Sequence, residues 1–355
     1  MVKRAGRRRR RTLQDVADAV GLSVNTVSRA LNDMPGVGAA TRARIKHEAD
    51  RIGYVPNAHA RSLVLGSRKT IGVVVTDLAN PFFSDLVSEI EARATAAGYT
   101  LLLLLSYEDP LREQAAVDAA LRAGVDGIIG VAVSDRGNPW ESVVKAHVPL
   151  VLVAREVPGV TADFYSADNE AGRRRSADLV VEGGARDILI LEEGFLTSTV
   201  QHRIDGIRAS LLSHDIEFDS GRVELVPSRM SRSATMWRGD DAYRIINDLL
   251  DRGRLPDAVL AGNDYFALGV YTAFRERGVR IPDDVAVVGW GDYPFARFLD
   301  PPLTSVHLPA VEVAARATTR LLALIDGASE PPVSHYVAPE LVFRRSTLSP
   351  APRSR

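Results

Sequence analysis

The stretch that decides the fold of the N-terminal region is TLQDVADAVGLSVNTVSRALN, residues 12–32. Apolar residues recur at helical spacing in its first half, with Thr12 as the expected N-cap and Gly21 as the expected end of the helix. Ser23 is the expected N-cap of a second helix that runs through Leu31. Two short helices joined by a glycine-containing turn are typical of a helix-turn-helix.

The second predicted helix has an outward polar face that suits the major groove of DNA. Asn25, Ser28, Arg29 and Asn32 recur along it at i, i+3, i+4 and i+7. Asparagine can pair with adenine edges, arginine with guanine edges, and hydroxyls and amides with phosphate oxygens. A third helix is expected over residues 40–52. The alternative is a three-helix bundle whose surface has no partner.

The charge of the chain is divided between its two parts. Residues 1–69 contain 15 Lys and Arg against 5 Asp and Glu, whereas residues 70–355 contain 29 against 40. A small basic segment on a larger acidic body is what a polyanion-binding domain joined to a second functional domain requires. For the basic arm at residues 3–11, a solvated tail without a partner is the alternative.

Length and composition exclude several classes of protein. A chain of 355 residues predicts two or three domains, and 46% hydrophobic with 25% charged residues is typical of soluble globular proteins. The absence of cysteine excludes disulfides and thiolate metal sites and fits a reducing cytoplasm. We expect no membrane span, because no run of about 18 apolar residues exists. We expect no signal peptide, because the basic N-terminus lacks an apolar stretch.

The N-terminal motifs resemble the headpiece of the LacI/GalR family of bacterial repressors. The match covers residues 12–32, then TRARI and GYVPNAHARSL. The resemblance implies base contacts by Val24, Asn25 and Arg29, and phosphate contacts by Thr12, Ser23, Thr26, Ser28, Asn32 and Thr41. This chain departs from the family at Gly38, where relatives often carry a phosphate-binding serine. It also departs at Val24, which can touch a thymine methyl but cannot donate a hydrogen bond.

Residues 57–65, NAHARSLVL, are too short to form a stable helix alone in water. The resemblance implies a hinge helix that folds on the operator and enters the minor groove, with Asn57 as its cap. Leu63 would be the wedge between base pairs, and Ala60 would allow close approach to the twin helix. The alternative is an ordinary linker. We therefore assign residues 1–56 to the DNA-binding domain and 57–69 to the hinge and linker.

Beyond residue 70 the pattern changes to alternating strands and helices. Buried strands are expected at residues 71–75, 101–105, 127–133, 150–154, 188–191, 259–261 and 285–288. Amphipathic helices are expected at residues 83–97, 112–123, 169–181, 201–214, 241–252 and 265–277. This alternation predicts parallel βαβ units, and the pattern restarts near Ile188 as two α/β lobes would. Such sheets bind ligands beyond the carboxyl ends of their strands, so a cleft between the lobes is the expected site.

The body also resembles the effector domain of the same family, which is similar to periplasmic sugar-binding proteins. The motifs TDLANPFF, ADNEAG, RIDGIRASL, AGNDYFALG and GWGDYPFARFLDPPLTSV stand in the family order. The resemblance spans residues 12–345 and leaves 346–355 as a tail. It implies a ligand site formed by Asp77, Phe82, Phe83, Arg155, Thr199, Arg203, Trp237, Asn263 and Asp292. For Phe82 and Phe83 the alternative is a place in the core, and for Arg203 a place on the surface; the alignment across the loop of Trp237 is loose.

Two positions depart from this family pattern. Relatives usually carry an aspartate where this chain has Ala154, and G-x-D-D where it has GWGD at residues 289–292. Both carboxylates commonly hold sugar hydroxyls in the family. The ligand is therefore something other than a simple sugar, or Asp292 and Arg155 supply the contacts.

A search for catalytic motifs finds none that is complete. Gly66-Ser67-Arg68-Lys69-Thr70 lacks the earlier glycine of a P-loop, and no G-x-S-x-G is present. The seven histidines are scattered without a metal-ligand spacing. We therefore expect no enzyme activity, cofactor or metal. A ligand-binding protein of the periplasmic kind is the second alternative, which the attached headpiece and the lack of a signal sequence disfavour.

The resulting hypothesis is an α/β protein with a helix-turn-helix headpiece and a two-lobed effector domain. It would be a cytoplasmic, nucleoid-associated bacterial regulator, most simply a repressor, that binds double-stranded operator DNA. One helix-turn-helix contacts only a half-site, so we expect a homodimer on a near-palindromic operator, with a tetramer left open. Closure of the lobes around a small-molecule effector, a sugar or sugar derivative, would control operator affinity through the hinge segments.

Overall fold

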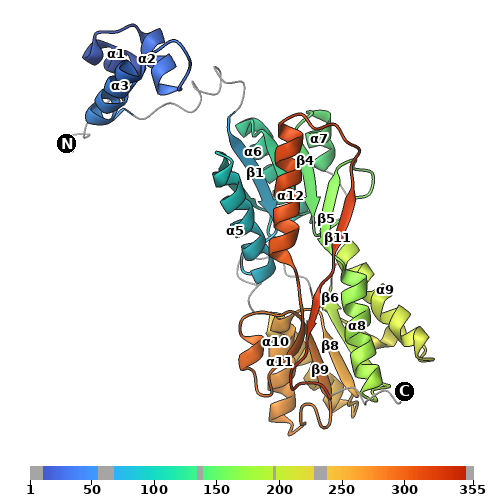
Figure 1. Ribbon diagram of the computed structural model, residues 1–355. Helices are drawn as coiled ribbons and strands as arrows, with labels where there is room; N and C mark the ends of the chain where they lie inside the picture. The colour runs from blue at the N-terminus through green and yellow to red at the C-terminus, as the bar shows by residue number, and fades with distance from the viewer. Residues whose placement is uncertain (1–10, 55–67, 134–138, 195–196, 228–237, 349–355) are drawn as a thin grey trace, which may run out of the picture. The chain divides into compact units, whose positions relative to one another are not determined.

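This computed structural model describes residues 11–54, 68–133, 139–194, 197–227 and 238–348 (Figure 1). The chain divides into two compact units, residues 1–69 and 70–355, which we call the headpiece and the body. The fold class expected from the sequence is confirmed: a helical headpiece is followed by a two-lobed α/β body.

The headpiece contains three helices: α1 (Leu13–Val20), α2 (Val24–Leu31) and α3 (Ala39–Ile52). The predicted caps are confirmed. The Thr12 hydroxyl accepts from the backbone N–H of Asp15, and the Asp15 carboxylate accepts from the backbone N–H of Thr12. Gly21 ends α1 in the left-handed region at φ 69°. The inward faces of the helices form a small core that includes Val16, Ala17, Val27, Ala30, Ile45 and Ala49.

The first lobe of the body contains a six-stranded parallel sheet in the order β11-β5-β4-β3-β1-β2. Its strands are β1 (Thr70–Val75), β2 (Thr100–Leu105), β3 (Gly127–Gly130), β4 (Leu150–Val153), β5 (Asp163–Ala167) and β11 (Ser334–Val337). One face is covered by α5 (Pro81–Ala96) and α12 (Ala310–Ile325), and the other by α6 (Pro110–Ala123) and α7 (Trp140–Lys145) (Figure 1).

The second lobe contains a six-stranded sheet in the order β12-β10-β9-β8-β6-β7, in which β12 runs antiparallel to β10. Its strands are β6 (Ile188–Glu193), β7 (Val223–Val226), β8 (Ala258–Ala261), β9 (Ala286–Gly291), β10 (Thr304–His307) and β12 (Glu340–Val342). Helices α8 (Asn169–Glu182) and α9 (Ser198–Ser213) cover one face, and α10 (Arg238–Asp251) and α11 (Asp264–Glu276) the other. The short 3-10 turns are η1 (Ser220–Arg222) and η3 (Ala296–Phe298).

Most strands of the body are buried on both faces, which explains their continuous runs of Val, Ile and Leu. The predicted body helices begin and end within three residues of the observed ones. The predicted strand at 127–133 is too long, because β3 ends at Gly130 and the backbone N–H of Val133 donates to the carboxylate of Glu113 instead of to a strand.

The chain passes between the lobes after β5, after β10 and after β11. As a result, α12 and β11 return to the first lobe and β12 to the second, an exchange that the sequence analysis did not predict. Ser346 and Thr347 are buried and hydrogen-bond into the second lobe, through Val287 and Thr304. The assignment of residues 346 and 347 to a tail is therefore corrected: the body extends at least to Thr347.

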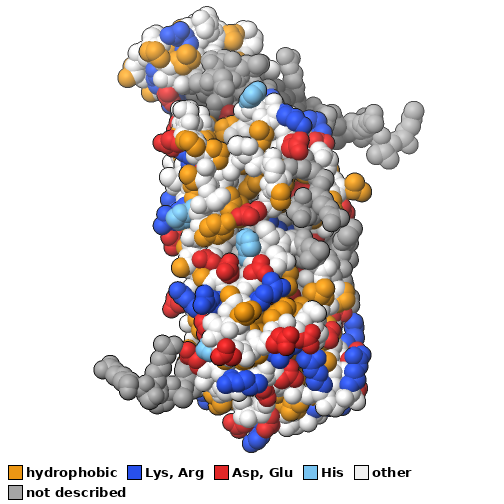
Figure 2. Space-filling model, turned by 90° about the vertical axis from the view of Figure 1, so that its right-hand side faces the viewer, with side chains coloured by type: hydrophobic (Ala, Val, Ile, Leu, Met, Phe, Trp, Pro, Cys, Tyr) orange, Lys and Arg blue, Asp and Glu red, His pale blue; other side chains and the backbone are white. Residues whose placement is uncertain are grey.

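The surface of the body carries both signs of charge. On the face drawn in Figure 2, Lys and Arg side chains are interspersed with Asp and Glu side chains. The acidic excess of the body is therefore not concentrated in one patch on this face. Among the described residues, no helix is long and apolar enough to cross a membrane.

Candidate functional site

The first candidate site is the outward side of α2 in the headpiece. Val24 and Asn25 are exposed in its first turn, and Ser28 and Arg29 are partly exposed one turn later. The other side of the helix is buried in the headpiece core. The predicted base-reading residues therefore share an accessible surface, and their role on DNA stays a prediction.

The predicted phosphate contacts gather at helix N-termini. Thr12 and Ser23 are the N-caps of α1 and α2, and the hydroxyls of Ser23 and Thr26 lie 2.8 Å apart. Thr41 lies in the first turn of α3, whose N-cap Gly38 provides no side chain. Helix N-termini favour anions because their outermost N–H groups lack partners within the helix and the helix dipole is positive there. A phosphate oxygen would be stabilised at these positions.

Asn32, a further predicted phosphate contact, has a structural role in the absence of DNA. Its side-chain amide donates to the backbone carbonyl of Ser28 at 2.9 Å and closes the last turn of α2. A phosphate bound at this position would contact a side-chain amide that already donates one hydrogen bond, to Ser28. Four other predicted site residues lie outside the described part of the chain: Asn57, Ala60, Leu63 and Trp237.

The second candidate site is a cavity between the two lobes of the body. The centre of a water molecule can occupy about 100 Å³ of this cavity. One bound water needs roughly 10–15 Å³ on the same measure, so the cavity has room for a larger molecule. Its lining comes from loops and helix starts beyond the carboxyl ends of the parallel strands, as the sheet topology predicts. Seven of the predicted ligand residues line it: Asp77, Phe82, Phe83, Arg155, Thr199, Arg203 and Asn263.

The first-lobe wall combines aromatic faces with carboxylate and hydroxyl oxygens. Phe82 and Phe83 begin α5 and pack edge to face, with ring centroids 5.3 Å apart. Asp77 and Thr76 follow β1 and are buried. One oxygen of the Asp77 carboxylate and the hydroxyl of Thr76 have no hydrogen-bond partner among the described residues. Both residues line the cavity, and a buried polar group without a partner is costly, so these oxygens are the candidates for a hydrogen bond to a ligand.

Arg155 follows β4 and is held by a buried carboxylate. Its guanidinium donates to both oxygens of Glu108, at 2.7 and 2.9 Å, and to the carbonyl of Ala132. Burial is the largest single effect and lowers the pKa of Arg155, but the charge and hydrogen bonds of Glu108, together with the charges of Glu193 and Glu113, outweigh it, so the pKa is raised. Arg155 is thus a neutralised donor at the cavity wall. The preceding Ala154 has no polar side chain to replace the carboxylate of relatives.

On the second-lobe side, Arg203 of α9 is also paired with a buried carboxylate. Glu192 accepts from Arg203 at 2.7 Å and from the fully buried Arg173 at 3.1 Å. Both guanidinium groups lie near the ring of Trp290, at 4.5 Å for Arg173 and 5.6 Å for Arg203. Burial lowers the pKa of Arg173 to about 10. Two cations therefore share one carboxylate beneath an aromatic cavity wall.

Asn263 and Thr199 are positioned by the ends of second-lobe elements. Asn263 is the N-cap of α11, because its side-chain oxygen accepts from the backbone N–H of Phe266 at 3.0 Å. Its amide nitrogen donates to Glu193 at 3.3 Å. Thr199 lies in the first turn of α9, with its hydroxyl 2.9 Å from that of Thr197.

Asp292 does not occupy the place that the sequence analysis gave it. It is not among the residues that line the cavity, and its carboxylate forms an ion pair with Arg344 at 2.7 Å. The neighbouring ring of Tyr293 leaves no room for a side chain at Gly291. A Cβ built at Gly291, where φ is 118°, would lie 2.3 Å from the ring of Tyr293. Tyr293 therefore fills the space into which a side chain at 291 would extend.

Sequence reasoning missed several residues of the cavity lining. Trp290 lies near the end of β9, Tyr293 follows that strand, Tyr265 lies in the first turn of α11, and Asn80 caps α5. The motif at residues 289–292 was noted for its missing carboxylate, although the tryptophan within it was the available signal. The aromatic side chains from separate segments become one wall only in the folded chain, with Tyr265 and Tyr293 ring centroids 5.1 Å apart.

The end of β9, where Trp290 lies, and the turn that follows it are positioned by a buried carboxylate. Asp264 accepts hydrogen bonds from the backbone N–H groups of Trp290 and Tyr293, at 2.8 and 2.6 Å, and from the hydroxyl of Ser305. Burial raises the pKa of Asp264 to about 6 despite these bonds. Among the described residues, no group of three or more His, Cys, Asp or Glu side chains is arranged to hold a metal ion.

A helix-turn-helix unit joined to a two-lobed α/β domain with an interlobe cavity defines a transcriptional regulator with a ligand-binding domain. Residues 12–57 match the model of bacterial regulatory proteins of the lacI family, and residues 177–347 match a periplasmic binding protein-like domain. The chain thus combines a DNA-binding domain of the lacI family with a periplasmic binding protein-like domain, and its relatives are transcriptional regulators and not enzymes.

Relatives and solved structures agree over nearly the whole chain. The transcriptional regulator DegA of Bacillus subtilis is 28% identical over 95% of this chain and 98% of its own length. The regulator GalR of Escherichia coli is 28% identical over 96% of each chain. The lac repressor dimer bound to operator and the anti-inducer ONPF is 26% identical with a TM-score of 0.84, over 96% of this chain and all of that one. The CelR–cellobiose complex is 27% identical with a TM-score of 0.71, over 95% of this chain and all of that one.

Proposed function

We propose that this regulator binds a near-palindromic operator as a homodimer and represses transcription until a small effector enters the interlobe cavity. The observation that carries the proposal is the pairing of an exposed, polar α2 surface with a cavity that holds unpartnered buried oxygens. The similar lac repressor was solved as a dimer on its operator, which supports the dimeric assembly. We place the protein in the bacterial cytoplasm, at the nucleoid where its operator lies.

On the operator, α2 would lie in the major groove with Val24, Asn25 and Arg29 at base edges. Ser28 and the hydroxyls at the helix N-termini would contact phosphates and fix the register. Residues 57–69 would form the hinge, in which Leu63 inserts into the minor groove and Ala60 permits close approach of the twin segment. If Leu63→Ala left operator affinity unchanged, the wedge role would be wrong.

The effector would be a small polar ring compound, a sugar or sugar derivative. Hydroxyl groups of such a ligand would donate to Asp77 and Thr76 and accept from Arg203, while Phe83 or Trp290 would pack on an apolar ring face. Arg155 and Arg203 are each paired with a carboxylate, and the carboxylates of Asp77 and Glu193 line the same cavity, so the cavity favours an uncharged ligand over an anionic one. The cellobiose complex of CelR supports a sugar.

The coupling would pass through contacts that join the lobes at the cavity. The Tyr293 hydroxyl of the second lobe donates to the side-chain oxygen of Asn80 in the first lobe at 2.9 Å. The same oxygen accepts from the backbone N–H of Phe82 and thereby caps the start of α5. An effector that displaces either side chain would shift the first lobes of the dimer and, with them, the hinge segments.

Selection from a random pool tests the DNA-binding part of this proposal. The full-length protein is used to recover duplexes from a library of random sequence, with and without candidate effectors. We expect two inverted half-sites spaced by about one helical turn, roughly 10 base pairs, and an affinity that falls steeply with salt. Recovery of no preferred duplex under either condition would overturn the proposed function.

A thermal-shift screen of sugars, sugar phosphates, nucleosides and purines on the full chain tests the effector part. We expect a stabilising compound among the uncharged sugars or sugar derivatives, and loss of both the shift and the operator response in Arg203→Ala. Arg208→Ala is the matched control, because Arg208 lies on the same helix and forms an exposed ion pair with Asp205. If Arg203→Ala also lost operator binding without effector, Arg203 would have a structural role instead.

A further inference from the structure

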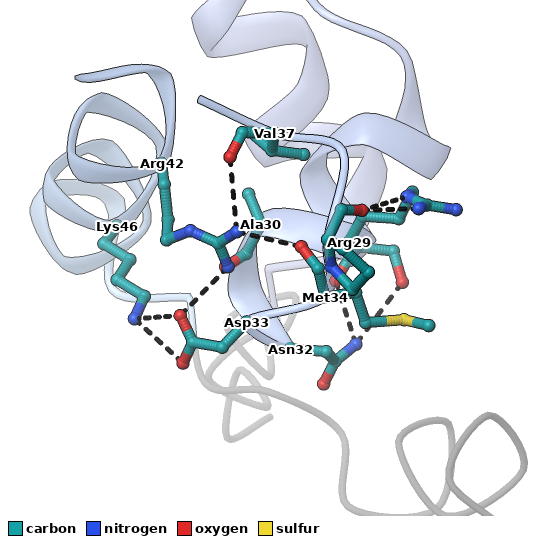
Figure 3. A network of polar contacts seen from close by, with 10 residues as sticks. Arg29, Ala30, Asn32, Asp33, Met34, Val37, Arg42 and Lys46 are labelled. Carbon is teal, nitrogen blue, oxygen red and sulfur yellow. Dashed lines mark hydrogen bonds and ion pairs between the residues drawn. The ribbon is translucent and has the colours of Figure 1, made fainter. Parts of the chain in front are cut away.

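The loop that follows α2, residues 33–37 with the sequence DMPGV, holds the side chain of Arg29 (Figure 3). The Nε and Nη2 atoms of Arg29 both donate to the carbonyl of Pro35, at 3.2 and 2.5 Å. A Cβ added at Gly36 would lie 3.1 Å from Nη2, and Gly36 has a φ of 93°. The guanidinium therefore packs against backbone that only a glycine readily forms.

Arg42 of α3 fixes this loop to the rest of the headpiece. Its guanidinium donates to the carbonyls of Met34 and Val37, at 2.8 and 3.3 Å, and to the carbonyl of Ala30 at 3.4 Å. The same group donates to the carboxylate of Asp33 at 3.1 Å. One side chain thus joins the last turn of α2 to both ends of the loop (Figure 3).

A second tether acts on the first residue of the loop. The Lys46 ammonium donates to both carboxylate oxygens of Asp33, at 2.8 and 3.1 Å. Asp33 has a φ of 55°, a conformation that non-glycine residues adopt at a cost. The hydrogen bond from Lys46 contributes most to lowering the pKa of Asp33. Burial has a smaller effect that raises the pKa, and the hydrogen bond from Arg42 lowers it further. The two cations hold Asp33 in this conformation.

The hold on Arg29 leaves one edge of its guanidinium available. Arginine has five N–H donors in a fixed plane, and the Pro35 carbonyl takes the edge formed by Nε and Nη2. Nη1 points away from the loop (Figure 3). The edge formed by Nη1 and Nη2 keeps two parallel N–H donors, which can bind O6 and N7 of guanine in a bidentate manner. Orientation before binding reduces the entropy that a long side chain loses on contact.

We propose that residues 33–37 and Arg42 form a seat that orients Arg29 toward a base, so that Arg42 and Gly36 determine specificity without touching a base themselves. The inference rests on the proposed function, in which Arg29 reads a base pair. Arg42 is a positioning residue, because all four of its recorded acceptors belong to the headpiece.

A double-mutant cycle on the full-length protein tests the seat. The probe is the preferred duplex recovered from the random pool, together with duplexes altered at each base pair in turn. Arg29→Ala identifies the base pair that Arg29 reads. We expect Arg42→Gln to reduce discrimination at that same base pair by about tenfold, and to have no further effect on discrimination in the Arg29→Ala background. Arg51→Gln, which removes the same charge from the end of α3, is the control.

A second pair of variants keeps the test independent of the folding of Arg42→Gln. Gly36→Ala places a methyl group against Nη2, whereas Gly38→Ala meets no atom within 4 Å at an ordinary φ of −63°. We expect Gly36→Ala to reduce discrimination at the Arg29 base pair several-fold. We expect Gly38→Ala to leave it unchanged.

The outcomes separate the seat from the function on which it rests. If Arg42→Gln and Gly36→Ala weaken binding to all duplexes equally and keep the discrimination ratio, the seat is overturned and the regulator stands. If Arg42→Gln reduces discrimination equally with and without Arg29, the seat is also overturned. If the full-length protein prefers no duplex at all, the proposed function falls, and the seat with it.

Discussion

The headpiece and the body both place arginines at their candidate sites, but they hold them with different acceptors. In the headpiece, Arg29 is held by the uncharged carbonyl of Pro35. In the body, Arg155 and Arg203 are held by the carboxylates of Glu108 and Glu192, and their side chains are only about 8% exposed. The chemical group that orients each arginine therefore differs between the two regions.

This difference follows from what each arginine faces. A cation that binds a polyanion should keep its charge, and a carbonyl acceptor fixes its orientation without neutralising it. A cation that is buried beside an uncharged ligand must be compensated, because desolvation of an unpaired charge costs several kcal/mol. The headpiece thus preserves charge for DNA, whereas the body pairs its arginines with buried or largely buried carboxylates and presents them as oriented hydrogen-bond donors.

The largest expected effect comes from removing the shared carboxylate of the second lobe. Glu192→Gln leaves Arg173 and Arg203 buried without a counter-charge, and we expect it to lower the free energy of unfolding of the body by about 3–5 kcal/mol. Urea unfolding followed by tryptophan fluorescence reports on the body, because Trp140, Trp237 and Trp290 all lie there. Glu312→Gln, at an exposed ion pair with Arg316, should cost less than about 1 kcal/mol. Equal losses in both variants would contradict the comparison.

A smaller effect of opposite sign is expected at Glu113, a buried carboxyl that forms no ion pair within the described part of the chain. Burial raises its pKa from 4.5 to about 7. Between these pH values the folded state binds a proton that the unfolded state has released. The contribution of this carboxyl to stability is therefore complete below pH 4.5 and is lost as the pH rises through 7.

Glu113→Gln removes this pH dependence without removing the hydrogen bonds. One oxygen of Glu113 accepts from both Val133 and Trp140, and the amide oxygen of glutamine can take its place. Relative to the unchanged protein, we expect the variant to gain up to about 3 kcal/mol in free energy of unfolding between pH 4.5 and pH 8. Urea unfolding at a series of pH values measures the gain. A variant that is less stable at every pH would show that the carboxylate is needed.

In the headpiece, the corresponding change is expected to alter recognition more than stability. Arg29→Ala should reduce discrimination at one operator base pair by about 1–3 kcal/mol, because a bidentate arginine contact contributes that much. Equilibrium binding to duplexes altered at single base pairs measures the effect. An equal loss of affinity for every duplex would make Arg29 a phosphate contact. The arginines of the headpiece and the body would then differ only in how exposed they are.

The smallest effect is expected at the first cap of the headpiece. Thr12→Ala removes the hydroxyl that accepts from the backbone of Asp15, and should destabilise α1 by about 1 kcal/mol. Hydrogen exchange of the amides of residues 13–20 measures it without interference from the body. Thr12→Ser keeps the hydroxyl and should restore protection. If the amides of Thr12→Ser were as poorly protected from exchange as those of Thr12→Ala, the methyl group and not the capping hydroxyl would stabilise α1.

Elements whose signals are local could be read directly from the amino-acid sequence. The caps Thr12 and Ser23, the stop at Gly21 and the buried strands of the body could all be predicted, because capping and hydrophobic periodicity act over a few neighbouring residues. The position of the cavity also followed, since parallel sheets place their ligand-facing loops at one edge.

Only the tertiary structure decided which side chains share that cavity and how their charges are balanced. The return of α12 and β11 to the first lobe depends on the pairing of short strands such as Ser334–Val337, which carry no continuous apolar run. Asp292 turns to Arg344, and Tyr293 takes the space beside Gly291, through contacts between segments distant in sequence. Such contacts depend on geometry that only the packed lobes create. For the same reason, no local pattern revealed that Arg42 holds the loop on which Arg29 rests.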